Sequence, residues 1–277
     1  MRHKTVLVLG SEGQIGKPLV NYLKNQGLNV LTFDIDSDPV EDLRIRDNKL
    51  LERYMTESEF VFFLAYDVGG AKYLYNHQHT YDFIDNNIRI MSNTFESLKR
   101  IDVPFIFASS QMADMTESTY GLLKEVGERY TTSIGGLNVK LWNVYGPEVG
   151  SEKSHVITDF IEKAQTEKKI EMMTDGLEIR QLLHADDCAS CMLSLCKEYD
   201  NLDKTKNYHM TSFEWVSILD VATEVSSNFS DVKIIPSSTT DSIHSGWKVE
   251  PDKHILNYWK PNITLSEGIK DIIGGMQ

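Results

Sequence analysis

Short apolar runs alternate with helical patterns through the first half of the chain. The runs are rich in β-branched and aromatic residues, which is typical of strands buried on both faces of a sheet. They occupy Val6–Leu9, Val30–Phe33, Phe60–Leu64, Phe105–Ala108 and Val139–Trp142. The helical patterns between them are carried by Ile15, Leu19, Tyr22 and Leu23, by Leu50, Leu51, Tyr54 and Met55, and by the stretch from Asn87 to Arg100. This alternation predicts a parallel sheet with right-handed crossovers, and therefore a doubly wound α/β domain.

The pattern changes after residue 145. A loop at Gly146–Ser151 precedes a predicted helix at Val156–Lys168 and a predicted strand at Ile179–His184. We expect further helices over 185–198, near 213–227 and near 265–273, and a strand at Val232–Ile235. The sequence therefore predicts a first domain over 1–145, to which 180–200 return, and a smaller α/β lobe made of 146–179 and 201–277.

Composition narrows the class of protein. The chain has 277 residues and carries 28 Lys and Arg against 41 Asp and Glu, a formal net charge of −13. This balance argues against a protein that coats nucleic acid or an anionic membrane, because both bind clustered positive charge. No apolar run approaches the roughly 20 residues of a membrane helix, and the first residues do not form a signal-peptide core. We therefore expect a cytoplasmic protein.

The three cysteines lie close together at Cys188, Cys191 and Cys196. No second Cys or His pair follows them at metal-ligand spacing. They share an apolar helical stripe with Met192 and Leu195, and free Cys is among the most buried residue types. We expect buried structural thiols and no metal site.

Three glycines stand where the first predicted strand ends and the first helix begins. The turn reads Gly10-Ser11-Glu12-Gly13-Gln14-Ile15-Gly16. Glycines permit a tight turn and let backbone N–H groups approach a pyrophosphate at a helix N-terminus. The next strand ends at Asp34, near the distance at which an acid binds the adenosine ribose of a dinucleotide. Its carboxylate would repel a 2′-phosphate, which favours NAD over NADP, whereas Arg44 and Arg46 nearby argue mildly for the phosphate.

Tyr120 and Lys124 are the candidate catalytic pair. They stand one helical turn apart, so their side chains lie on one face of a helix. A cationic neighbour favours the phenolate, and we expect Lys124 to lower the pKa of Tyr120 enough for it to take a proton from a sugar hydroxyl. Ser110 ends the preceding strand, at the sheet edge where ligands bind in open α/β folds.

Taken in order, these motifs resemble the extended short-chain dehydrogenase/reductase family, which comprises nucleotide-sugar epimerases, dehydratases and reductases. Further points of resemblance are Asp42-Leu43, Leu64-Ala65, Ser109-Ser110, Asn143-Val144-Tyr145-Gly146-Pro147, and Arg180 followed by His184-Ala185-Asp186-Asp187. The resemblance implies a Rossmann-type sheet with a smaller substrate lobe, NAD as cofactor, and a homo-oligomer, either dimer or tetramer. The expected interface is formed by the helices at Asn87–Arg100 and Tyr120–Ser133.

The same resemblance implies a role for each matched residue. Tyr120 is the expected base, Lys124 binds the nicotinamide ribose, and Ser110 holds the reacting oxygen. The expected cofactor contacts are Gly10, Gly13, Gln14, Ile15, Gly16, Asp34, Ile35, Asp42, Leu43, Leu64, Ala65, Tyr66, Ser109, Tyr120, Lys124, Leu141 and Trp142. The expected substrate contacts are Ser110, Gln111, Asn143, His155, Val156 and Arg180. An arginine fork at Arg180 suits a diphosphate.

Two departures from the family pattern narrow the expected reaction. Gln111 and Met112 follow Ser110 at positions where 4,6-dehydratases carry an Asp-Glu pair. Glutamine cannot act as an acid, so dehydration is disfavoured. The segment between Ser110 and Tyr120 has only nine residues, fewer than the family usually has, which predicts a more open nicotinamide pocket.

We therefore predict an NAD-dependent oxidoreductase that acts at C4 of a nucleoside-diphosphate sugar, with GDP favoured as the nucleotide. Within the family, Asp67-Val68-Gly69-Gly70, Ser109-Ser110-Gln111-Met112 and the short loop are most similar to GDP-heptose 4-dehydrogenases of bacterial surface-polysaccharide synthesis. A C4 or C3/C5 epimerase, or a 4-keto reductase, would use the same residues. A non-catalytic scaffold or sensor that binds NAD is the alternative from another class.

Overall fold

The computed structural model describes residues 3–115, 117–147, 155–240 and 249–275. Its helices and strands follow one another as β1 (Thr5–Leu9), α1 (Gly16–Asn25), β2 (Asn29–Phe33), α2 (Lys49–Glu57), β3 (Phe60–Phe63), α3 (Ala71–His77), α4 (Tyr81–Ile101), β4 (Phe105–Ser110), α5 (Thr119–Ser133), β5 (Leu137–Leu141), β6 (Asn143–Tyr145), α6 (Val156–Glu167), β7 (Lys169–Glu171), β8 (Ile179–His184), α7 (Ala185–Glu198), β9 (Asn207–Met210), β10 (Trp215–Ser217), α8 (Ile218–Ser226), β11 (Lys233–Ile235) and α9 (Leu265–Gly275). Every strand predicted in the first half is present, with bounds that differ by a few residues.

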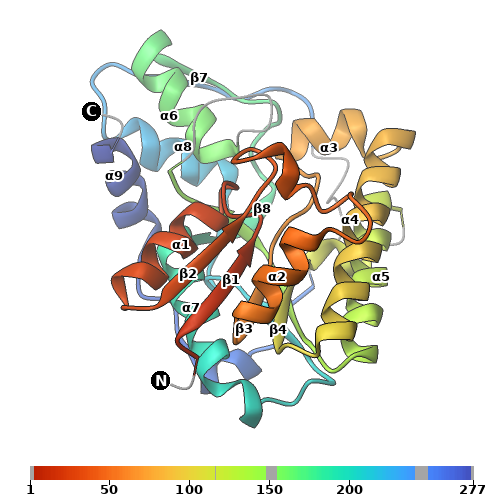
Figure 1. The fold of residues 1–277 in the computed structure, drawn as a ribbon. Helices are drawn as coiled ribbons and strands as arrows, with labels where there is room; N and C mark the ends of the chain where they lie inside the picture. The colour runs from red at the N-terminus through yellow and green to blue at the C-terminus, as the bar shows by residue number, and fades with distance from the viewer. Residues whose placement is uncertain (1–2, 116, 148–154, 241–248, 276–277) are drawn as a thin grey trace.

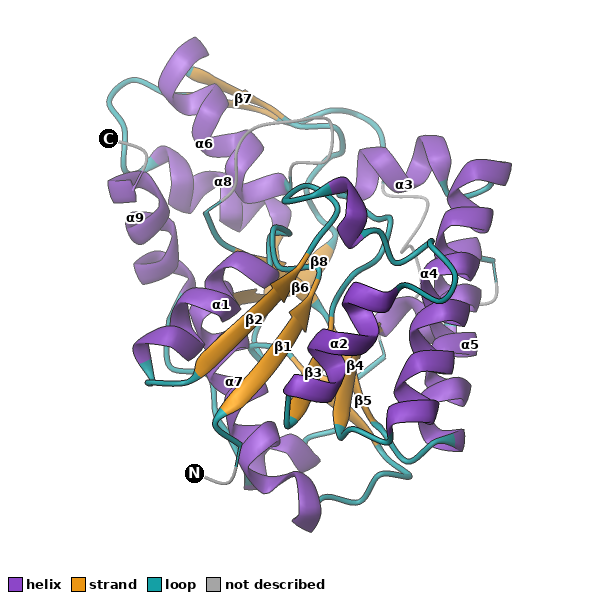
Figure 2. Cartoon of the chain, viewed as in Figure 1, coloured by secondary structure: helices purple, strands orange, loops and turns teal. Residues whose placement is uncertain are grey.

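A parallel sheet forms the centre of the molecule. Within the described ranges it has six strands in the order β2-β1-β3-β4-β5-β9. Helices α1 and α7 cover one face, and α2, α4 and α5 cover the other (Figures 1 and 2). The apolar side chains of β1 and β3 are buried on both faces, as their uninterrupted hydrophobic runs require. The predicted doubly wound α/β fold is confirmed.

The cysteine-bearing segment forms α7, which packs on α1 against the sheet. Cys188, Cys191 and Cys196 are all buried there as free thiols. Burial raises the pKa of Cys188 and Cys196 to about 12, because a thiolate in apolar surroundings loses its hydration. These thiols therefore contribute packing and stay protonated at neutral pH.

The sixth strand, β9, was not predicted. Its sequence, Asn207-Tyr208-His209-Met210, alternates polar and apolar residues without the β-branched run that marks the other strands. Only its pairing with β5 places it in the central sheet, although the sequence analysis assigned 201–277 to the smaller lobe. Ile255 and Trp259 also pack into the core on the α1 and α7 side of this sheet.

The smaller lobe is built from β6, β8 and β10 together with α6, α8, α9 and the pair β7 and β11. The helix predicted near 213–227 begins later, at Ile218, because Trp215–Ser217 pair with β8 as β10. Ser217 then caps α8 through a capping box with Asp220, which fixes the helix start. Across the described residues, no helix is both long and apolar enough to cross a membrane.

Candidate active site

A large cleft opens along the carboxyl ends of β1 to β5. Its volume is about 1370 Å³, large enough for a dinucleotide and a second ligand together. All seventeen residues expected to contact the cofactor line it: Gly10, Gly13, Gln14, Ile15, Gly16, Asp34, Ile35, Asp42, Leu43, Leu64, Ala65, Tyr66, Ser109, Tyr120, Lys124, Leu141 and Trp142. The fold therefore gathers these positions, which are spread over more than a hundred residues, into one cavity.

The glycine turn between β1 and α1 leaves no room for side chains at two of its positions. Gly10 has φ +85°, and a Cβ there would stand 2.6 Å from the backbone nitrogen of Ala65. A Cβ on Gly16 would stand 2.0 Å from the carbonyl oxygen of Gly10. The turn is thus folded tightly back on itself, which brings the N-terminus of α1 to the cleft. A pyrophosphate fits such a backbone cradle, because helix N-termini present free N–H groups and a positive dipole end.

Acidic groups form the end of the cleft beside β2. Asp34 Oδ2 accepts a hydrogen bond from the Glu12 backbone N–H at 2.8 Å, which orders the carboxylate beside the glycine turn. The Asp34 backbone N–H donates to Glu41 Oε2 at 2.8 Å, and burial raises the pKa of the Glu41 carboxyl. This concentration of carboxylates suits ribose hydroxyls and is unfavourable for a phosphate.

Arg44, one of the two arginines that argued for a 2′-phosphate, is already engaged. Its guanidinium donates to both oxygens of Asp42, at 2.9 to 3.1 Å, and to Asn86 Oδ1 at 3.0 Å. The bond with Asp42 raises the pKa of Arg44, as expected for a charge-assisted fork. The residues present therefore fit NAD better than NADP.

Ser110, Tyr120 and Lys124, called here the catalytic trio, line the same cleft. Ser110 is the last residue of β4, and Tyr120 and Lys124 lie one turn apart on α5. Ser118 caps α5 by accepting from the Gly121 N–H at 3.1 Å. Gly121 packs so closely on the Met112 carbonyl that a Cβ would stand 2.1 Å from its oxygen. This contact presses the first turn of α5 against the segment after β4 and brings Tyr120 to Ser110.

The proton affinities in the trio differ from the sequence expectation. Burial raises the pKa of Tyr120 to about 12, and its hydrogen bond with Ser110 opposes that rise. Burial lowers the pKa of Lys124 to about 7, and the nearby Glu128 carboxylate opposes that fall. Lys124 Nζ donates to the Ala108 carbonyl at 2.6 Å and stands 3.7 Å from the ring centroid of Tyr66. The lysine is thus directed toward β4 and Tyr66, and the expected lowering of the Tyr120 pKa is absent from this arrangement.

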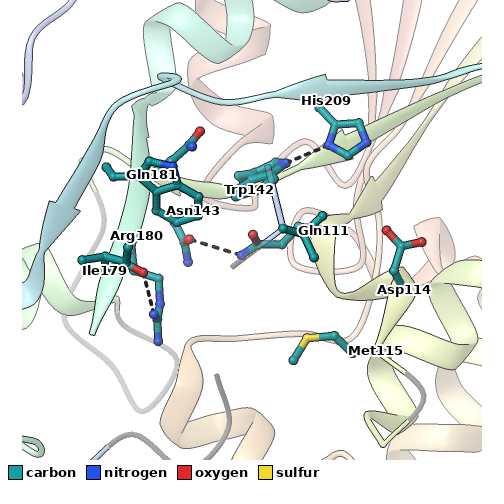
Figure 3. Close-up of a pocket in the computed structure, with 11 residues that line it drawn as sticks. Gln111, Asp114, Met115, Trp142, Asn143, Ile179, Arg180, Gln181 and His209 are labelled. Atoms are coloured by element: carbon teal, nitrogen blue, oxygen red, sulfur yellow. Dashed lines mark hydrogen bonds between the residues drawn. The ribbon is translucent and has the colours of Figure 1, made fainter. Parts of the chain in front are cut away.

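The expected substrate residues fall into two groups. Ser110, Gln111, Asn143 and His155 line the main cleft, and Gln111 Nε2 donates to Asn143 Oδ1 at 3.3 Å (Figure 3). Arg180 lines a smaller side pocket that shares Gln111, Trp142 and Asn143 with the main cleft. Val156 is not among the residues that line either cavity, because it starts α6 and packs partly against the apolar core of the smaller lobe.

Several site residues were missed by sequence reasoning. Asp114, His209 and Trp215 line the side pocket, and they come from three separate parts of the chain. Glu128 stands one helical turn beyond Lys124, so the spacing Tyr120, Lys124, Glu128 could have indicated it. Nothing comparable in the local sequence marks the other three.

Comparison with known proteins agrees with this site. The model of the NAD dependent epimerase/dehydratase family matches residues 6–210. The chain belongs to that family. A curated relative, GDP-mannose 3,5-epimerase 1 of Oryza sativa subsp. indica, is 27% identical over 270 aligned positions that cover 82% of this chain and 68% of the relative. UDP-glucuronic acid decarboxylase 6 of Arabidopsis thaliana is 20% identical, and the alignment covers 95% of this chain and 86% of the relative.

Solved structures show the same fold. A GDP-6-OMe-4-keto-L-xylo-heptose reductase from C. jejuni superposes with a TM-score of 0.84 and is 19% identical in sequence. The superposition covers 100% of this chain and 98% of the reductase chain. A UDP-glucose 4-epimerase from Thermotoga maritima gives a TM-score of 0.81, with 98% of each chain covered and 19% identity. At such identities the likeness establishes the architecture, and NAD is the cofactor named by the family itself.

Proposed function

We propose that this protein is an NAD-dependent oxidoreductase that acts at C4 of a nucleoside-diphosphate sugar. The observation that carries the proposal is the convergence of the catalytic trio in the cleft that also holds the glycine turn and Asp34. A protein that only bound NAD would have no need of a buried Tyr and Lys beside a serine hydroxyl. This argues against the alternative of a non-catalytic scaffold or sensor.

The chain's own residues would move the proton. NAD, when bound, supplies the acceptor for a hydride from the sugar carbon. Tyr120 would take the proton of the sugar C4 hydroxyl while Ser110 holds that oxygen by a hydrogen bond. To act as a base near neutrality, Tyr120 must fall from a pKa of about 12 by roughly five units, which is about 7 kcal/mol of differential stabilisation.

Lys124 is the chain's own source of that stabilisation. Its Nζ stands 5.8 Å from the ring centroid of Tyr120, at the edge of the range over which a cation shifts a neighbouring pKa. With a pKa of about 7 it is half charged at neutral pH, so a modest change of surroundings would set its charge. We infer that Lys124 would hold the nicotinamide ribose and that its charged form would favour the Tyr120 phenolate.

The substrate diphosphate would be held by Asn143, His155 and Arg180. Arg180 offers a planar guanidinium fork of the kind that suits phosphate oxygens. The names of the GDP-mannose epimerase relative and of the GDP-heptose reductase structure support a GDP-sugar. A role in surface-polysaccharide synthesis rests on the sequence resemblance to GDP-heptose 4-dehydrogenases. Gln111 beside Ser110 disfavours dehydration, because an amide cannot donate a catalytic proton.

A C4 or C3/C5 epimerase is the second candidate function. A 4-keto reductase is a variant of the first candidate, the NAD-dependent oxidoreductase. The curated relatives favour the epimerase, since one of them epimerises C3 and C5 of GDP-mannose by name. Both use the same trio. An epimerase returns its cofactor unchanged at each cycle, whereas a dehydrogenase or reductase shows net change in the NADH absorbance band.

We also propose a homo-oligomer that associates through α4 and α5. Leu122, Val126 and Tyr130 stand four residues apart on α5, and each is between 43% and 45% exposed. This spacing places them in one stripe along the outer face of the helix. A stripe of partly exposed apolar side chains suits the helix-to-helix interface of a dimer or tetramer.

Turnover by a Tyr120→Phe variant tests the assignment. The wild type should convert at least one GDP-sugar, followed by the NADH band and by product analysis. The Tyr120→Phe variant should lose about 10²- to 10⁴-fold in kcat while retaining affinity for NAD and the sugar nucleotide. Tyr130→Phe, on an exposed face of the same helix, is the matched control and should retain wild-type turnover. Unchanged kcat in Tyr120→Phe would refute the catalytic role.

A further inference from the structure

The side pocket contains Arg180, which the proposed function assigns to the diphosphate, but that function gives no role to Asp114, His209 and Trp215, which line the same pocket. Its volume is about 40 Å³, and it opens from the cleft at Gln111, Trp142 and Asn143. Gln111 directly follows Ser110, which would hold the reacting oxygen. A substrate group bonded next to the reacting carbon can therefore reach the pocket.

Hydrogen-bonding side chains and two indole rings line the pocket. Asp114 Oδ1 accepts from Lys140 at 2.6 Å, which leaves its second oxygen to accept from a ligand. His209 Nδ1 accepts from Trp142 Nε1 at 3.3 Å, so the neutral ring carries its proton on Nε2 and can donate. The rings of Trp142 and Trp215 meet edge to face, with centroids 5.7 Å apart. The pocket thus offers one carboxylate acceptor and one imidazole donor beside two indole rings, and Gln111, Asn143, Arg180 and Gln181 complete its polar lining.

Asp114 owes its position to a buried charge pair behind it. The Lys140 side chain is only 3% exposed and also stands 3.6 Å from Glu128 Oε1, whereas the Asp114 side chain is 50% exposed. Glu128 is itself held by the Ser109 hydroxyl and by Asn207 Nδ2. Burying a charged lysine and glutamate costs several kcal/mol of desolvation free energy unless the two groups pair closely and their remaining hydrogen bonds are made. This network holds one carboxylate oxygen of Asp114 in place and thereby fixes the orientation of the other.

We propose that the side pocket receives the exocyclic hydroxylated arm of the sugar, with Asp114 as the residue that selects for it. The inference rests on the proposed function. In a pyranose, C4 is bonded to C3, which carries a hydroxyl, and to C5, which carries the exocyclic arm. The space corresponds to roughly three water-sized groups, which suits a hydroxymethyl or a longer polyol arm better than a single ring hydroxyl.

The charge distribution separates this arm from the diphosphate. A phosphate beside the Asp114 carboxylate would meet like charge, whereas a neutral hydroxyl can donate to it. In Figure 3, Arg180 and Asp114 approach from opposite sides of the Gln111 and Asn143 pair. The arginine side therefore suits the diphosphate, and the aspartate side suits the neutral end of the sugar.

The test compares GDP-mannose with its 6-deoxy counterpart, which lacks the arm's hydroxyl. Binding to the NAD-loaded protein is measured by calorimetry, and turnover is followed by kcat/KM. The wild type should prefer GDP-mannose by about tenfold, the value of one hydrogen bond to a charged acceptor. Asp114→Asn should weaken GDP-mannose by about tenfold and leave the 6-deoxy sugar within about twofold.

Two controls make the outcome decisive. Asp102→Asn is the matched control variant. Asp102 is exposed at the end of α4 and precedes β4, so it lies at the end of the sheet opposite the cleft. Its φ of 59° is one that Asn tolerates. It should behave as wild type. Equal loss for both sugars in Asp114→Asn, or no wild-type preference, overturns the subsite while leaving the proposed oxidoreductase intact. Failure of the wild type to bind either sugar nucleotide would refute the proposed function, and the subsite with it.

Discussion

Replacing Lys124 with methionine should change how the stability of the protein depends on pH. Burial lowers the pKa of Lys124 to about 7 from 10.5 in the unfolded chain. Between these two values the unfolded chain binds more protons than the folded one, so the free energy of unfolding rises with pH. The stability is greatest above the unfolded pKa and is lost as pH falls toward 7.

The magnitude follows from the size of the shift. At about 1.4 kcal/mol per pH unit, keeping this lysine buried costs about 4 kcal/mol at pH 7 relative to its neutral form. The cost falls to about 1.4 kcal/mol near pH 9.5. The difference in unfolding free energy between the wild type and Lys124→Met should therefore move by about 3 kcal/mol in favour of the wild type over that interval. Met is of similar length and carries no charge, but it leaves the Ala108 carbonyl without its 2.6 Å partner.

Urea unfolding at a series of pH values measures this difference directly. The exposed Lys99→Met on α4 is the control and should keep the wild-type pH profile. Lys124→Met should also lose turnover, so the buried charge is a cost in stability that the proposed catalysis requires. A difference between wild type and Lys124→Met that stays flat from pH 7 to about 9.5 would refute the reasoning, because it would place the lysine in contact with solvent.

Two further changes test the cleft and the assembly. Gly16→Ala should lower the free energy of unfolding by about 1–3 kcal/mol and abolish NAD binding, because its Cβ would stand 2.0 Å from the Gly10 carbonyl oxygen. The control Gly274→Ala has open space around its Cβ and should change neither property. Thermal unfolding and an NAD titration measure the two effects. Val126→Glu should convert the proposed oligomer to smaller species in light scattering, because it places a charge in the apolar stripe of α5; an unchanged mass would place the interface elsewhere.

The sequence by itself determined the parts of the molecule that depend on neighbours along the chain. The alternation of β-branched runs and helical stripes predicted the order of β1 to β5, because burial on both faces leaves an uninterrupted apolar signature. The glycine turn and the one-turn spacing of Tyr120 and Lys124 could also be predicted from the sequence. Each depends on backbone conformation within one turn or on one face of one helix.

Other features were decided by tertiary structure alone. The strand at Asn207–Met210 has no apolar run of its own and takes its conformation from pairing with β5. The side pocket joins Asp114, His209 and Trp215 across about a hundred residues, a separation over which local sequence pattern carries no information. The low pKa of Lys124 follows from its burial against β4 and the Tyr66 ring, and desolvation is a property of the packed fold. The sequence thus identified which residues could react, and packing set their proton affinities and the shape of the space around them.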